Sequence, residues 1–340
     1  MIKKDLQYYI SYFLTTYIGG ERGLSENTFT SYEYTFKILV SYLTERLKKP
    51  INKIALEDFN AENIKDFLAQ LEASGCSGAT RNQRLAAIKS FCRYVQMESP
   101  SVLYNMSQIL AIPSKRFAKP TIQYLSKHQL ELLLNEPDSS NRYGFKDLLI
   151  LAVLSDSGMR VSELINIKVS DVRLQKPYQI KVHGKGNKDR WTPISESSAE
   201  LLKLYFKKEE QFDPLFQSRN LFINRSKKPF TRAGITYILQ KYTKAVHEKY
   251  PNDFPEKLTP HCLRHTKAML MLEAGHNLIY IRDILGQEHI KTTEIYARVD
   301  SKQMRTALET VQAQIPAPNP ADIKFDQDPA TLAWLKDYCS

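Results

Sequence analysis

Apolar residues recur every three or four positions in four stretches of the first third of the chain, which is the spacing of an amphipathic helix. The stretches cover residues 6–17, 29–47, 64–71 and 85–95. Ser74 and Gly75 follow the third stretch, and such a pair is typical of a helix end. The pattern predicts a small helical domain over residues 1–112.

The stretch that follows has no apolar period. Residues 112–120 contain two prolines and three cations, and proline stops a helix because it has no amide proton. We predict a linker over residues 113–122 and a second domain over residues 123–315. Three more prolines then open a tail, residues 316–340, whose apolar side chains need a surface to pack on. That surface is either its own domain or, as the more specific hypothesis, a neighbouring subunit.

The second domain also has mostly helical periodicity. Helices are expected near residues 126–135, 144–157, 196–208, 231–249, 260–274, 277–285 and 291–297. Two strand-like runs, 179–182 and 191–194, flank residues 184–189, whose Gly and Asn residues tolerate the backbone of a tight connection. The pattern predicts a β-hairpin with a basic tip, and a mainly α fold with a small antiparallel sheet.

The composition narrows the class of protein. A chain of 340 residues fits two domains, and 42% hydrophobic residues with 12 Gly and 16 Pro exclude collagen-like and largely disordered proteins. The four cysteines are scattered without C-x-x-C spacing, so we expect neither a disulfide framework nor a zinc module. The N-terminus has no continuous apolar run, so we expect no signal peptide, no membrane partner and a cytoplasmic location.

The charge favours a polyanionic partner. Lys and Arg number 48 against 37 Asp and Glu, a formal net charge of +11. The first 112 residues carry 13 basic and 11 acidic side chains, so most of the excess lies after them. Basic proteins attract nucleic acid through electrostatics and counterion release. A solvated lysine surface is the alternative.

Basic side chains also flank the fourth predicted helix and the hairpin tip. They are Arg81, Arg84, Lys89 and Arg93 on the helix, and Lys188 and Arg190 on the hairpin. We expect these side chains to bind the phosphates of a nucleic acid, although solvated charge is again the alternative.

The usual cofactor motifs are missing from the sequence. It has neither a G-x-x-x-x-G-K-[ST] run nor a G-x-G-x-x-G after a predicted strand, and its carboxylates are dispersed. His261 and His265 have the i, i+4 spacing of zinc ligands, but Cys262 stands where H-E-x-x-H has Glu. We therefore expect no metal and no nucleotide cofactor.

A different motif surrounds these histidines. Pro260 suits the first turn of a helix, and His261 and Arg264, three residues apart, share one face of it. Thirty-two residues after Arg264 comes Tyr296, which follows a predicted helix end at Gly286 and threonines that can cap the next helix. Two anion-binding groups thus precede a tyrosine.

With two further segments, these motifs resemble the tyrosine recombinase (phage integrase) family. The segment 157–164, SGMRVSEL, supplies Arg160 and Glu163, and the hairpin supplies Lys185. Residues 261–265 read HCLRH, and Leu-Gly at 285–286 precedes Thr-Thr and Tyr296. The resemblance covers residues 144–300. The first domain is similar to the family's helical core-binding, or SAM-like, domain.

The resemblance implies a role for each catalytic residue. Tyr296 attacks a DNA phosphate, while Arg160 and Arg264 offer paired donors to the oxygens on which negative charge develops. A free phenol has a pKa of about 10, so the nucleophile needs a proton acceptor. His261 is the implied acceptor, and Lys185 the implied general acid for the departing 5′ oxygen.

Four further residues belong to the expected site. Glu163 orients the site by resemblance, and an ordinary intrahelical ion pair is the alternative. His265 is expected to support the site. Gln287 stands where the family usually has His or Trp, and an amide donates a hydrogen bond but carries no charge, so this contact should be weaker. His289 is a candidate substitute for it.

We therefore expect a site-specific DNA recombinase acting through a 3′-phosphotyrosyl intermediate. This link conserves the energy of the broken phosphodiester, so no cofactor is needed. The resemblance implies a homotetramer on double-stranded DNA with paired recombination sites, nucleoid-associated in a bacterial cell. Integration and excision of a mobile element is the favoured role. Xer-type chromosome dimer resolution, a catalytically weak DNA-binding relative and a type IB topoisomerase are the alternatives.

Overall fold

The computed structural model describes residues 5–21, 26–117, 122–184, 189–208 and 217–287, together with Thr293 and Tyr296. The chain divides into two compact units, Met1–Thr121 and Ile122–Ser340. The tail expected at 316–340, and the helix expected near 291–297 apart from those two residues, lie outside the described part. No helix of the described ranges has both the length and the apolar character needed to cross a membrane.

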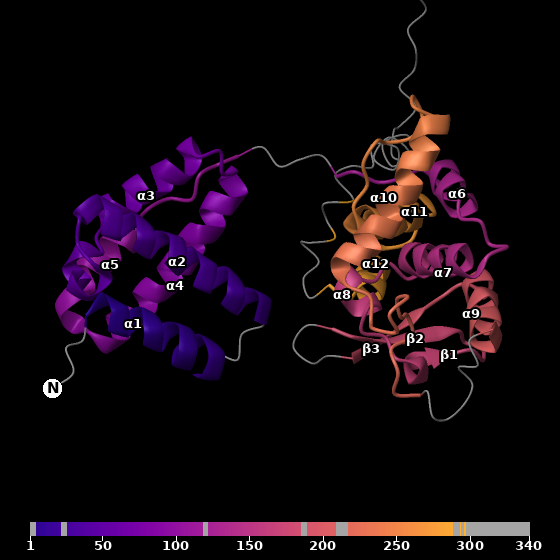
Figure 1. The fold of residues 1–340 in the computed structure, drawn as a ribbon, viewed down its shortest axis with the longest axis horizontal. Helices are drawn as coiled ribbons and strands as arrows, with labels where there is room; N and C mark the ends of the chain where they lie inside the picture. The colour runs from indigo at the N-terminus through magenta and orange to yellow at the C-terminus, as the bar shows by residue number, and fades with distance from the viewer. Residues whose placement is uncertain are drawn as a thin grey trace, which may run out of the picture. The chain divides into compact units, whose positions relative to one another are not determined.

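The first unit is built from helices (Figure 1). They are α1 (Leu6–Tyr12), α2 (Glu26–Leu47), α3 (Ala61–Ala73), α4 (Gly78–Glu98) and α5 (Leu103–Leu110), with a π-helical segment at Phe13–Glu21. Asn60 and Ser77 cap α3 and α4 by accepting hydrogen bonds from backbone amides of the first turn. The core contains Phe13, Phe36 and Phe91, whose ring centroids lie 5.2–5.7 Å apart.

The chain that leaves α5 packs back on α4. The side-chain amide of Asn82 donates to the carbonyl of Lys115 at 2.8 Å and accepts from the amide of Lys115 at 3.0 Å. Lys89 donates to the carbonyl of Ile112 at 2.6 Å. These contacts hold residues 112–115 against the first unit.

The second unit combines helices with a small sheet (Figure 1). Its elements are α6 (Lys127–Asn135), α7 (Arg142–Ser157), α8 (Val161–Leu164), β1 (Val172–Arg173), β2 (Gln179–His183), β3 (Asp189–Pro193), α9 (Glu196–Lys208), α10 (Arg232–Lys249), α11 (Pro260–Glu273) and α12 (Leu278–Leu285). The antiparallel strands follow the order β1-β2-β3, and His183 pairs with Asp189 at the end of the hairpin. The predicted fold class, mainly helical with a small antiparallel sheet, is confirmed.

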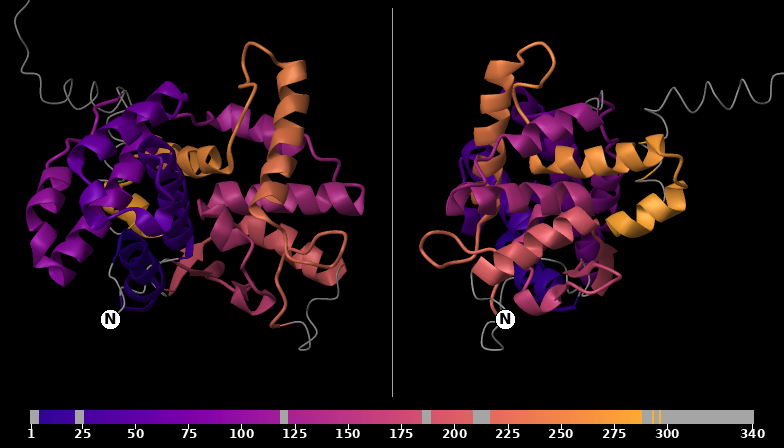
Figure 2. Two further views of the ribbon diagram at one scale, coloured as in Figure 1. Left: turned by 60° about the vertical axis from the view of Figure 1, so that its left-hand side comes forward. Right: turned by 90° about the vertical axis from the view of Figure 1, so that its right-hand side faces the viewer.

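Buried apolar side chains of α7, α10 and α11 form much of the core of the second unit. In both views of Figure 2, the far end of α10 and the loop after it protrude from the rest of this unit. Two helices end at glycines with left-handed backbone: α7 at Gly158, φ +62°, and α12 at Gly286, φ +61°. Both glycines border the candidate site.

Candidate active site

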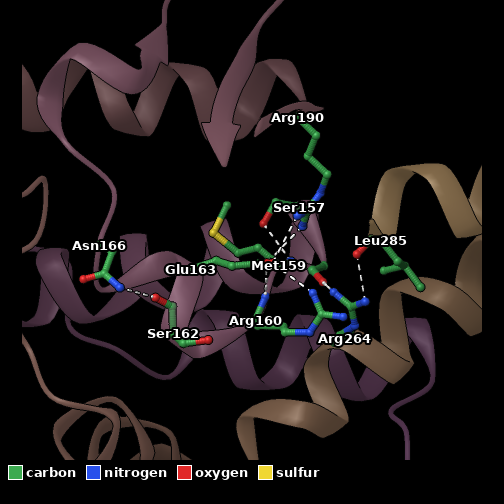
Figure 3. Close-up of polar contacts among 10 residues, drawn as sticks. Ser157, Met159, Arg160, Ser162, Glu163, Asn166, Arg190, Arg264 and Leu285 are labelled. Carbon is green, nitrogen blue, oxygen red and sulfur yellow. Dashed lines mark hydrogen bonds and ion pairs between the residues drawn. The ribbon is translucent and has the colours of Figure 1, made fainter. Parts of the chain in front are cut away.

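Arg264 of α11 is held between two helix ends. It is 2% exposed, and it donates to the carbonyls of Gly158 and Leu285, each at 2.8 Å (Figure 3). Carbonyls at the end of a helix carry partial negative charge, which favours a cation. Burial lowers the pKa of Arg264 to about 10, so the guanidinium stays charged at neutral pH.

Arg160 caps the short helix α8, and its partner is the buried carboxylate of Glu163. Glu163 accepts from the backbone amide of Arg160 at 2.7 Å and from its Nη1 at 2.9 Å. The Arg160 side chain is 40% exposed, whereas that of Glu163 is 5% exposed. The pair therefore closes the cap of α8, and its carboxylate is buried.

Arg190 of β3 binds the same carboxylate. Its Nη1 and Nη2 donate to the two oxygens of Glu163 at 3.1 and 2.9 Å. The side chains of Arg160, Arg190 and Arg264 thus come from different elements and point into one region (Figure 3). The sequence suggested that Arg190 contacts DNA, but both of its terminal nitrogens are engaged with Glu163.

Two histidines of α11 lie beside this group. The rings of His261 and His265 meet edge to face, with centroids 4.6 Å apart. Burial lowers the pKa of His265 to about 4, with smaller contributions from His261 and Arg264. Burial and the charges of Arg264 and Arg160 also lower the pKa of His261. The imidazole of His265 is therefore neutral at pH 7.

Tyr296 is buried against α11 and α12, with 1% of its surface exposed. Its hydroxyl lies 2.9 Å from Nδ1 of His265. Burial raises the pKa of Tyr296, while the charge of Arg264, a hydrogen bond with Gln287 and the charge of Arg160 act in the opposite direction. Gln287 also accepts from the hydroxyl of Thr293 at 2.6 Å. The phenol is thus protonated at neutral pH and held in place.

A cleft of about 320 Å³ opens beside Arg160 and His261. Arg232 and Thr236, from the first turns of α10, also line it. Neither residue was expected from the sequence. The available signal was a cation in the first turn of a helix, where the helix dipole disfavours positive charge. An Arg in that position suggests an anion in the cleft.

Three predicted residues, Lys185, Lys188 and His289, lie outside the described residues. In the first unit, Arg84 donates to the hydroxyl of Thr35 at 2.9 Å, and Arg81 lies 2.8 Å from Glu72. Lys89 holds the chain after α5, as described above. Arg93 is exposed. Three of the four helix cations expected to bind DNA thus have partners within their own unit.

The described part of the chain contains no group of three or more His, Cys, Asp or Glu side chains placed to hold a metal ion. It does contain a buried tyrosine, Tyr296, in contact with His265. His261, Arg160 and Arg264, the other residues that the sequence motifs named, belong to the same site.

The chain belongs to the phage integrase family: residues 123–303 match the model of that family, and residues 12–98 match that of the phage integrase N-terminal SAM-like domain. It is a tyrosine-type site-specific recombinase, an enzyme that cuts and rejoins DNA. The predicted resemblance is confirmed.

Among its relatives is a putative integrase/recombinase, y4rC, of Sinorhizobium fredii, 34% identical over 85% of this chain and 86% of the relative. The tyrosine recombinase XerD of Staphylococcus haemolyticus is 32% identical over 85% of this chain and 93% of the relative. The Tn1549 transposon integrase in complex with circular intermediate DNA shares the fold. It has a TM-score of 0.65 at 18% identity, over 88% of this chain and 98% of that one.

Proposed function

We propose that this recombinase cuts DNA by attack of the Tyr296 oxygen on a phosphate held by Arg160 and Arg264. One observation carries the proposal: the Tyr296 hydroxyl lies 2.9 Å from Nδ1 of His265, whose ring packs on that of His261, a residue of the cleft beside Arg160. The charges of Arg264 and Arg160 also oppose the rise that burial causes in the pKa of Tyr296. A phosphate bound to these cations would therefore lie beside the phenol. Guanidinium groups suit this position because they offer paired donors to phosphate oxygens.

The reaction is a pair of transesterifications. A bond forms between the Tyr296 oxygen and phosphorus as the bond to the 5′ oxygen breaks, and that oxygen leaves as a hydroxyl. A 5′ hydroxyl of another strand then attacks the phosphotyrosyl link and releases the tyrosine. The negative charge that grows on the non-bridging oxygens in each step is stabilised by the fixed guanidiniums.

The two histidines have different surroundings, which supports different roles. In the free protein His265 contacts the phenol, so we propose that it holds the nucleophile in place. His261 lines the cleft, and we propose that it accepts the phenol proton once DNA occupies the cleft. Lys185 stays our proposed donor of a proton to the 5′ oxygen.

For the biological role we propose integration and excision of a mobile element. The y4rC relative is named a putative integrase/recombinase, and Gln287 departs from the usual family residue; these two points support the role. Since another relative is named XerD, Xer-type chromosome resolution stays the alternative. Such a protein would act in the bacterial cytoplasm as a homotetramer on two duplex sites. Sequencing the DNA that copurifies with the protein tests the role: sites at the ends of a mobile element support it, and one site in the chromosomal terminus region contradicts it.

We also propose that the tail at 316–340 docks on a neighbouring protomer. A largely apolar groove of about 780 Å³ on the second unit, lined by residues of α6, α7, α9 and α11, is suited to receive it. The tail offers Leu332 and Trp334 for such a groove. Removing residues 328–340 should abolish assembly on paired sites in sedimentation experiments, and unchanged assembly would contradict the docking.

The catalytic proposal is tested with DNA selected by binding from a random-sequence duplex library. A nick placed on the 3′ side of the cleavage position lets the short fragment that bears the new 5′ hydroxyl diffuse away, and this traps the covalent complex. Wild-type protein and a Tyr280→Phe variant, altered at an exposed tyrosine of α12, should form this complex. Tyr296→Phe should form none. Tight, salt-sensitive binding without any covalent complex would indicate a DNA-binding relative that has lost catalysis.

A further inference from the structure

Arg190 is a half-buried cation whose terminal nitrogens bind Glu163 rather than either of the proposed phosphate ligands or Tyr296. Its side chain is 17% exposed, and both terminal nitrogens bind Glu163. Its Nε is buried without a hydrogen-bond partner in the described structure. An unpaired buried donor destabilises the folded protein, and the two bonds to Glu163 offset that cost.

The guanidinium of Arg190 also lies against Gly286. A Cβ added there would lie 2.5 Å from Nε and 2.6 Å from Cζ of Arg190, so only glycine leaves room for it. Gly286 directly follows Leu285, whose carbonyl holds Arg264. It also precedes Gln287, which hydrogen-bonds with Tyr296. Arg190 therefore touches the turn on which the second phosphate ligand and the nucleophile depend.

Arg190 also determines how many N–H donors of Arg160 are left free of Glu163. Glu163 has two oxygens, and Arg190 supplies a donor to each of them. Arg160 gives the carboxylate its backbone amide and one terminal nitrogen, which leaves the rest of its guanidinium unengaged by Glu163. Without Arg190, the buried carboxylate would draw more donors from Arg160, because a buried charge needs to be paired.

We propose that Arg190 is a positioning residue that fixes the separation between Arg160 and Arg264 and keeps donors of Arg160 available for the scissile phosphate. It acts through Glu163 on one side and through Gly286 on the other. Because β3 carries it, it also ties the hairpin that bears residue 185 to both phosphate ligands. This inference rests on the proposed function.

The first test is Arg190→Lys, which keeps the charge but loses the two-pronged geometry. At saturating nicked duplex, the rate of covalent-complex formation should fall about 10- to 100-fold, because small misplacements of catalytic groups have effects of that size. The dissociation constant for the duplex should change less than about threefold. Arg173→Lys, at an exposed position of β1, is the matched control and should match wild type.

Weaker DNA binding with an unchanged rate of cleavage would overturn the proposal. If Arg190 binds a DNA phosphate directly, Arg190→Lys should weaken binding and change its salt dependence, while saturated complexes cleave at the wild-type rate. Wild-type protein that forms no covalent complex would instead refute the proposed function. A variant as fast as an active wild type refutes only the role of Arg190.

A second pair of variants separates an effect on the site from a general loss of stability. Gly286→Ala places a methyl group against the Arg190 guanidinium, whereas Gly275→Ala imposes similar backbone strain at φ +83° with no atom within 4 Å of the new Cβ. Both should melt at a lower temperature than wild type. Only Gly286→Ala should slow covalent-complex formation, and its effect should shrink in an Arg190→Lys background. Equal rates for the two alanine variants would contradict the inference.

Discussion

Replacing Glu163 with Gln removes the one negative charge that two arginines share. The carboxylate accepts four hydrogen bonds at 2.7–3.1 Å, two from Arg160 and two from Arg190. A glutamine has nearly the same size but only one acceptor oxygen, and its amide group would face donors. The substitution therefore breaks the pairing without leaving a cavity.

The expected loss of stability follows from burial. Breaking a buried ion pair by removing one partner costs about 3–5 kcal/mol. Here Arg160 is 40% exposed, so water offsets part of the loss, and we expect about 2–4 kcal/mol. For a unit of this size, each kcal/mol shifts the melting temperature by about 2–4 °C. The midpoint should fall by roughly 5–15 °C.

The stability lost in Glu163→Gln should depend on pH. Burial alone would raise the pKa of Glu163, but hydrogen bonds and charges from Arg190 and Arg160 hold it below its ordinary value of 4.5. A lowered carboxyl pKa contributes stability that is fully present above the unfolded value and is lost as the pH falls through the folded value. The gap between wild type and Glu163→Gln should therefore shrink below about pH 4.5.

Thermal melts by circular dichroism across pH, combined with covalent-complex assays, measure both effects. Glu200→Gln is the control, because Glu200 pairs with Lys203 on the surface of α9 at 2.7 Å and exposed pairs contribute little. It should melt like wild type. A Glu163→Gln protein that also melts like wild type at pH 7, or a gap that does not depend on pH, would refute the reasoning.

Three other variants or titrations check separate parts of the site. Gly158→Ala puts a Cβ 2.7 Å from Leu285 at φ +62° and should lower stability by about 1–3 kcal/mol and slow cleavage; wild-type cleavage would contradict this. Nuclear magnetic resonance should find the His265 midpoint near 4 in the free protein, where an unshifted imidazole would titrate near 6.5. Gln287→His should speed covalent-complex formation about fivefold, because charge-assisted hydrogen bonds are stronger; a slower variant would show that the amide itself is needed.

The larger elements were predictable because the apolar residues of each one recur at a regular spacing. The 3.6-residue spacing defines the long helices, and the Gly- and Asn-rich stretch before residue 189 defines the hairpin. Three elements were not expected from the sequence: α5, of eight residues, and β1 and α8, of two and four residues. Such short elements form through contacts with distant residues: β1 pairs with β2, and the Glu163 side chain caps α8.

The candidate site was predictable in composition more than in arrangement. Ordered motifs named Arg160, Arg264 and Tyr296, and the structure brings them together. The sequence did not show that Arg190 serves Glu163, since the two are 27 residues apart and meet only because the β2–β3 hairpin packs against α8 and α12. Nor did it show that His265, rather than His261, contacts the phenol in the free protein.

The most direct test of the central claim is to identify the atom that carries the DNA. The covalent complex formed on the nicked duplex is digested with nuclease and trypsin, and the modified peptide is sequenced by mass spectrometry. We predict a nucleotide joined through its 3′ phosphate to the only tyrosine of the tryptic peptide 292–298, which is Tyr296. A nucleotide on any other residue, or a covalent complex formed by Tyr296→Phe, would contradict the account.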